Sequence, residues 1–176
     1  GEKSIIGKIL LRHDIAFDEK LHEVVNILTK LLKVKRCSIM IINPEDLTLE
    51  VKASTNPEII GFKRRLSDVA ISTRALIDNE PFHSDSKRRS FFRPLDSSQY
   101  SSECSVSIPM KYLDKKLGVI NLTDSEEGKP FSIEQEIIAM DVAQHLAPYI
   151  YAEQIREQLD IKIKKLEDAN KRLAEL

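Results

Sequence analysis

The chain begins with two stretches whose apolar residues recur at helical spacing. Residues 3–14 place isoleucine or leucine at every third or fourth position. After a break around Phe17, the apolar residues of 21–32 recur at i, i+3, i+4 and i+7, which predicts an amphipathic helix. We expect Asp18 to be the N-cap of this helix, because its carboxylate can accept from the unpaired amides of the first turn.

A second helical region closes the chain. The sequence Ser132-Ile133-Glu134-Gln135 is typical of a capping box and predicts that a helix starts there. Apolar residues then continue at helical spacing to Leu146. Pro148 has no backbone N–H, so we expect it to kink this helix before helical character resumes and runs to the end of the chain.

The centre of the chain follows a different, alternating pattern. All seven prolines lie between Pro44 and Pro148, which separates this centre from the two helical flanks. Apolar and polar residues alternate over several short runs, which is typical of half-buried strands. The predicted strands are 37–42, 47–53, 62–66, 104–110 and 117–122, and the segment 69–78 has helical periodicity.

Turns and loops connect the predicted strands as hairpins. The turn residues Asn43-Pro44-Glu45-Asp46 join the first two strands. Residues 83–103 are polar and rich in serine, which predicts a long loop, and Pro109 marks the following strand as an edge or bulged strand. Hairpin strands flanked by helices predict an α+β fold, with an antiparallel sheet and helices packed on one of its faces.

Composition and charge narrow the classes of function. The formal net charge is −1, so no global basic field argues for binding to nucleic acid or to an anionic membrane. No apolar run approaches the roughly 20 residues that span a bilayer, so no membrane segment is expected in this fragment. Cys37 and Cys104 lie in apolar stretches and are interpreted as reduced, buried thiols, which favours a cytoplasmic location. Gly1 and an end inside a helical pattern suggest a piece of a longer protein.

Residues 151–176 have the pattern of a coiled coil. This segment contains neither Gly nor Pro, and its apolar seam would consist of Ala152, Ile155, Leu159, Ile163, Leu166, Asn170 and Leu173. The step from Leu159 to Ile163 is a stutter in the heptads, and Asn170 would fix the register. The narrow seam favours a parallel homodimer formed through the terminal helices. The alternative is that the helix folds back on its own domain.

Five short stretches, taken in order, carry a resemblance to a known family. They are Gly61–Leu66, Ala75–Phe82, Ser107–Lys111, Lys116–Thr123 and Lys129–Ser132. No single stretch is specific, but the ordered set resembles the GAF domain family, the sensory modules of bacterial signalling proteins, over roughly 18–153. The resemblance implies an antiparallel sheet of about six strands between helices.

The resemblance also implies where a ligand would bind. Ligands in this family usually lie between the sheet and a loop such as 83–103. The residues expected to face such a ligand are Phe62, Ile71, Phe82, Phe91, Cys104, Val106 and Asn121. The basic cluster Lys87-Arg88-Arg89 is either a lid over an anionic ligand or part of a solvated surface loop.

Other properties of the family are matched only in part. Members that bind cyclic nucleotides carry an N-K…F-x-x-x-D-E motif, of which this chain keeps Asn121, Phe131 and Glu136 but has Leu122 and Gln135 at the other two positions. Neither cysteine is followed by the histidine of bilin-binding members. The four histidines have no zinc-site spacing, so no metal site is expected, and the sequence identifies no cofactor.

These observations give three expected parts: a helical extension at 1–17, a GAF-like sensory domain at 18–150 and a coiled-coil signalling helix at 151–176. The expected function is ligand sensing, relayed through the dimeric helix to an output domain outside this chain, with a diguanylate cyclase or a histidine kinase favoured. No catalytic residue is assigned. The alternatives are a ligand-free dimerisation module and, less favoured, an enzyme that reduces free methionine sulfoxide.

Overall fold

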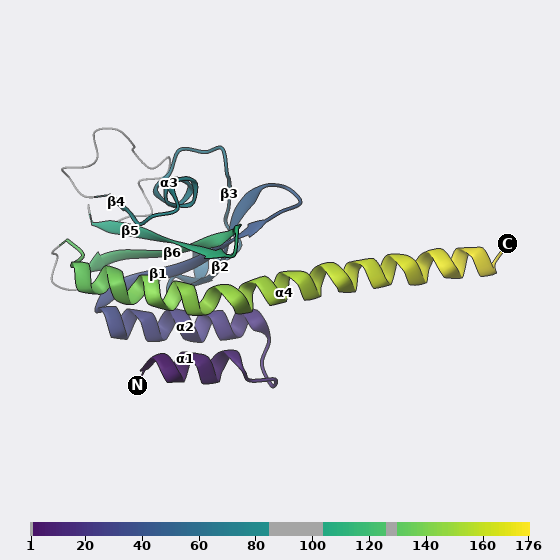
Figure 1. Cartoon of the computed structure of the whole chain (residues 1–176), viewed down its shortest axis with the longest axis horizontal. Coiled ribbons are helices and arrows are strands. Elements are labelled where there is room, and N and C mark those ends of the chain that lie inside the picture. Colours follow the sequence, from purple (N-terminus) through teal and green to yellow (C-terminus); the bar gives the residue numbers. More distant parts are fainter. Residues whose placement is uncertain (1, 85–103, 126–129) are drawn as a thin grey trace.

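The computed structural model describes residues 2–84, 104–125 and 130–176 of the chain (Figure 1). The helices are α1 (Glu2–Leu10), α2 (Phe17–Leu32), α3 (Ile71–Asp78) and α4 (Ile133–Ala174), with a single 3-10 turn at Pro57–Ile59. The strands are β1 (Val34–Asn43), β2 (Thr48–Ser54), β3 (Lys63–Arg65), β4 (Phe82–Ser84), β5 (Ser105–Tyr112) and β6 (Lys115–Ser125).

The strands form one antiparallel sheet of six strands in the order β3-β2-β1-β6-β5-β4, which confirms the predicted α+β fold class. β4 was not predicted from the residues, because three residues are too few to show a period. β4 pairs with β5 only from Ser105 to Ser107. At Pro109, β5 is therefore paired on one side, with β6, and has no strand on its other side in the described part of the sheet. This matches the prediction that proline marks an edge.

Helices cover both faces of the sheet. Figure 1 shows α1, α2 and α4 on one side and α3 on the other. The larger apolar core lies between the sheet and the helices α1, α2 and α4, and a smaller one lies under α3 around Met40, Leu49 and Val119. The expectation that helices pack on one face is therefore wrong for α3. That short helix needs its own buried surface, which the second face of the sheet supplies.

The amphipathic pattern of residues 21–32 is confirmed by α2. Its buried side chains are Leu21, Val24, Val25, Leu28 and Leu32. The predicted N-cap is wrong, because the N-cap residue of α2 is Ala16, which makes no side-chain cap. Asp18 lies inside the first turn of the helix. A carboxylate in the first turn still stabilises the helix through its dipole.

α4 begins with the predicted capping box. The amide of Gln135 donates to Ser132 Oγ at 3.1 Å, and the amide of Ser132 donates to Gln135 Oε1 at 2.8 Å. The helix then continues for 42 residues, through Pro148 and through the expected boundary at 150/151. Pro148 therefore leaves the helix continuous. Among the described helices, none combines the length and apolar character that crossing a bilayer requires.

Gly118 lies at the closest approach between two central strands. It pairs with Ile41 of β1, and a Cβ atom placed on Gly118 would lie 2.0 Å from the backbone oxygen of Met40. No side chain can relieve such an overlap, since the obstacle is backbone. The pairing of β1 with β6 therefore requires glycine at this position.

We predict that Gly118→Ala destabilises the protein by about 3 kcal/mol or more, because the added methyl group must push the two strands apart. Gly7→Ala is the matched control. Gly7 lies in α1 with open space around it, so alanine should leave stability unchanged or raise it by roughly 0.5–1 kcal/mol. Chemical denaturation of both variants measures the difference. Equal stability of the two variants would contradict the close approach.

Candidate functional site

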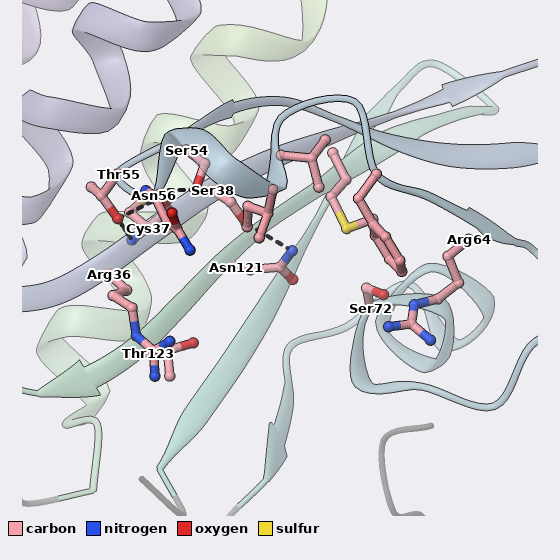
Figure 2. Close-up of a pocket in the computed structure, with 14 residues that line it drawn as sticks. Arg36, Cys37, Ser38, Ser54, Thr55, Asn56, Arg64, Ser72, Asn121 and Thr123 are labelled. Carbon is pink, nitrogen blue, oxygen red and sulfur yellow. Dashed lines mark hydrogen bonds between the residues drawn. The ribbon is translucent and has the colours of Figure 1, made fainter. Parts of the chain in front are cut away.

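A pocket of about 240 Å³ opens on the α3 side of the sheet (Figure 2). Strands β1, β2, β3 and β6, the 3-10 turn and the first turn of α3 supply its walls. The lining residues are Arg36, Cys37, Ser38, Met40, Val51, Ser54, Thr55, Asn56, Ile59, Phe62, Arg64, Ser72, Asn121 and Thr123. Figure 2 shows Arg64 and Ser72 together at one end, and Arg36 and Thr123 at the other.

The alternation of the two central strands explains why the pocket is polar. Ile39 and Ile120 pair with each other and face the larger core. Their neighbours Ser38 and Asn121 also pair, and their side chains face the pocket. Successive residues of a strand point to opposite faces of the sheet, so the same two strands supply an apolar core and a polar pocket floor.

Asn121 is held in place by hydrogen bonds at the centre of this floor. Its Nδ2 donates to Ser38 Oγ at 3.2 Å, and Ser107 Oγ donates to its Oδ1. All three side chains are buried, each no more than 8% exposed. A buried amide whose two ends are both bonded has a fixed orientation, so Asn121 presents a constant surface to any ligand.

The segment after β2 is fastened to β1 at one end of the pocket. Thr55 Oγ1 accepts from the amide of Cys37 at 3.1 Å, and the amide of Thr55 donates to the Cys37 carbonyl at 2.9 Å. The Asn56 side chain caps the 3-10 turn by accepting from the amide of Glu58 at 3.1 Å. These bonds fix the pocket wall formed by Ser54, Thr55 and Asn56.

Arg64 is a buried cation at the opposite end. It is the middle residue of β3 and pairs with Leu49, so its side chain points to the α3 side, where it is only 6% exposed. Its guanidinium carbon lies 5.5 Å from the centre of the Phe62 ring. Its buried Nε has no hydrogen-bond partner, and no ion pair forms between Arg64 and an acid of the described residues.

Cys37 lies at the edge of the pocket, but its thiol is poorly suited to act as a nucleophile. The residue is 2% exposed and belongs to the larger core, and this burial raises the pKa of the thiol well above its usual value. The reactive form of cysteine is the thiolate, which burial in apolar surroundings disfavours. Among the described residues, no group of His, Cys, Asp or Glu side chains could hold a metal ion.

The structure brings some of the predicted site residues together. Phe62 and Asn121 line the pocket. Ile71 is buried in the first turn of α3, next to the lining residue Ser72, and Phe82 packs against the apolar cluster beneath α3. Cys104 is partly buried and precedes β5. Phe91 and the basic cluster at 87–89 lie outside the described residues, so the lid hypothesis stays a prediction.

Val106 was placed wrongly. Its side chain is 1% exposed and belongs to the larger core, on the face opposite the pocket. The apolar positions of β5 face the core on the α4 side, and the intervening serines face the other way, as the contact between Ser107 and Asn121 demonstrates. The alternation of β5 was therefore recognised, but its apolar side chains were expected to face the ligand instead of the larger core.

Several pocket residues escaped the sequence analysis, Arg64 and Ser38 among them. Ser38 stands as a polar residue inside the apolar run of β1, which is a signal that could have been used. Ser54 faces the pocket because a bulge opposite Ile39 and Met40 shifts the register of β2. Such a bulge exchanges the two faces of a strand and leaves no trace in the composition.

The sheet order and the pocket define the chain as a small α+β domain with one antiparallel sheet, a helical layer on one face and a ligand-sized pocket on the other. A family model described as GAF domain matches residues 16–150. The chain belongs to the GAF domain family. A search of curated proteins gave no match.

Solved structures similar to this chain come from several kinds of protein. The GAF domain of a phosphoenolpyruvate-protein phosphotransferase from Coxiella burnetii has a TM-score of 0.76 at 18% identity, covering 89% of this chain and 95% of that one. A methyl-accepting chemotaxis protein, residues 122 to 287, has a TM-score of 0.70 at 17% identity, covering 86% and 96%. At these identities the likeness concerns the fold alone.

Enzymes are also among the similar structures. The type II free methionine-R-sulfoxide reductase from Thermoplasma acidophilum has a TM-score of 0.61 at 14% identity, covering 86% of this chain and 96% of that one. The same fold therefore occurs both in a chemotaxis protein and in enzymes, and the shared fold does not decide between these roles.

We predict that Cys37 is protected from alkylation in the folded protein. At about pH 8 an exposed cysteine reacts readily with iodoacetamide, because part of it is thiolate. Cys37 should react more than about a hundredfold more slowly in the native chain than in denaturant, and peptide mass spectrometry can follow each cysteine separately. Native labelling of Cys37 at the denatured rate would contradict the buried, protonated thiol.

Proposed function

We propose that this chain is a ligand-sensing regulatory GAF domain of a signal-transduction protein. In this proposal a small molecule enters the pocket over β1 and β6, and the state of the pocket is relayed through α4. One observation carries the proposal. The strands β1 and β6 supply the polar floor of the pocket, and the ends of the same two strands contact α4 where this helix leaves the domain. Occupation of the pocket changes the helix only if the two helix states differ in affinity for the ligand.

The contacts at the exit of α4 support such a relay. Gln154 Nε2 donates to the carbonyl of Ile42, in the strand that also supplies Ser38 to the pocket, at 3.1 Å. The rings of Tyr112 and Tyr151 lie 5.0 Å apart between centroids, which joins the hairpin of β5 and β6 to the same turn of the helix. Small displacements of these strand ends would therefore act directly on α4.

The exposed part of α4 supports dimerisation. Beyond Gln154 the helix has no buried residue, and apolar side chains of its seam remain exposed, with Ile155 at 38%, Leu159 at 52% and Leu166 at 65%. A single amphipathic helix of this length is marginal in water without a partner. A parallel coiled coil with a second copy of the chain would cover this seam.

The output domain and the compartment belong to the same proposal. A coiled coil that continues past the domain suits a protein in which a diguanylate cyclase or a histidine kinase follows in the cytoplasm. Catalysis by the domain itself is not proposed. The protonated state favoured for Cys37 argues against this thiol as the nucleophile of a sulfoxide reductase.

We predict that substitutions in the seam dissociate the dimer. Leu159→Lys combined with Leu166→Lys should raise the dimer dissociation constant at least about a hundredfold, because two like charges per chain would meet at the interface. Ile161→Lys is the matched control, since Ile161 is 45% exposed on the same helix but lies off the seam. Sedimentation equilibrium measures both. A monomeric wild-type chain at micromolar concentration would overturn the proposed dimer.

We predict that the pocket binds a small molecule and that binding changes α4. Native mass spectrometry of the purified chain, followed by a thermal-shift screen of metabolites, identifies the ligand. Spin labels at position 173 of the dimer should then report a different distance with and without it. If the chain dimerises but no molecule is retained or raises the melting temperature, the ligand-free dimerisation module is the better description.

A further inference from the structure

The charges of β3 are divided between the two faces of the sheet. The flanking residues are exposed, and each lies near an acid: Lys63 Nζ is 3.6 Å from Asp46 Oδ2, and Arg65 Nε is 3.4 Å from Asp68 Oδ1. Arg64 between them points inward, is buried, and has no such acid among the described residues. Within the described part of the chain, β3 thus has two outer cations near acids and one inner cation without an acid partner.

A buried guanidinium that has no acid partner among the described residues is unfavourable when it stands alone. A charge removed from water without an opposite charge or full hydrogen bonding destabilises the fold. The Phe62 ring at 5.5 Å offers a cation–π contact, but it supplies no acceptor for the buried Nε. An anion in the pocket would provide both the opposite charge and the missing acceptors.

The surroundings of Arg64 restrict the shape of such an anion. Ser72, from the first turn of α3, adds a hydroxyl at the same end (Figure 2), and the N-cap residue Ala70 has no side-chain acceptor for the amides of that turn. Apolar groups of Met40 and Val51 line the pocket beyond it. Its volume of about 240 Å³ has room for many waters, which suits a small molecule.

We propose that the pocket binds a small organic carboxylate, with the carboxylate on Arg64 and a short apolar body against Met40 and Val51. This inference rests on the proposed ligand-sensing function and specifies the ligand class of the same pocket. The planar guanidinium fork matches a carboxylate in shape, and one unpaired cation balances one negative charge. A phosphate monoester carries nearly two charges at neutral pH, and the other lining cation, Arg36, lies at the opposite end of the pocket from Arg64 (Figure 2).

The first experiment measures binding to the full chain with pairs of probes. The probes are the monocarboxylates from butyrate to hexanoate, their α-hydroxy and α-keto derivatives, the neutral amide of each acid, and isobutyl phosphate. Isothermal titration should show at least one carboxylate binding about tenfold or more tightly than its amide and than the phosphate, and Arg64→Met should weaken that acid by a similar factor. Equal affinity of acids and amides, or no binding by any acid, would overturn the proposal.

The second experiment needs no ligand. Arg64→Met should raise the melting temperature of the ligand-free chain by about 2–4 °C, because it replaces a buried unpaired charge with an apolar side chain of similar length. Arg65→Met is the matched control, since the Arg65 side chain is 78% exposed and paired with Asp68. The control should leave both the melting temperature and carboxylate binding unchanged. A lower melting temperature for Arg64→Met would assign Arg64 a structural role and overturn the proposal.

The two proposals can fail separately. A neutral metabolite that binds the wild type and Arg64→Met equally well would overturn the carboxylate as ligand class and leave ligand sensing intact. An empty pocket in native mass spectrometry, together with no response to any metabolite of the screen, would overturn ligand sensing itself.

Discussion

The pairing of β1 with β6 is the interaction on which the rest of the structure depends. These strands occupy the centre of the sheet, and every other strand is added outward from them. Their backbones come so close at Gly118 that no side chain fits there. The register that results sets Ile39 opposite Ile120 and Ser38 opposite Asn121, so one pairing defines the apolar core on one face and the polar pocket on the other.

This division has a consequence for communication. The larger core fills the space between the sheet and α2 and α4, and a close-packed interior of this kind transmits strain. In the proposed sensing function, a ligand on the opposite face would act on α4 through the strands that supply both the pocket and this core. The bond from Gln154 to Ile42 and the contact of Tyr151 with Tyr112 lie at the strand ends where such a displacement would emerge.

Long periodic segments were the predictable part of this structure. The spacing of residues 21–32, the capping box at Ser132 and the hairpin of β1 and β2 were all confirmed. The site was harder to predict, because alternation identifies two faces without saying which one a ligand meets. Val106 was assigned to the pocket for that reason. Arg64 was missed because a basic residue in a basic strand resembles ordinary surface charge, and only its pairing with Leu49 shows that its side chain points inward.

The unbroken course of α4 through Pro148 gives the domain a lever arm. From Ile150, its last fully buried residue, to Ala174 the helix extends about 36 Å at a rise of about 1.5 Å per residue. A tilt of only about 5° at the base would move the far end sideways by about 3 Å, which is comparable to the rise of two residues. A displacement too small to rearrange the sheet would thus be amplified into a change of position that a neighbouring domain can detect.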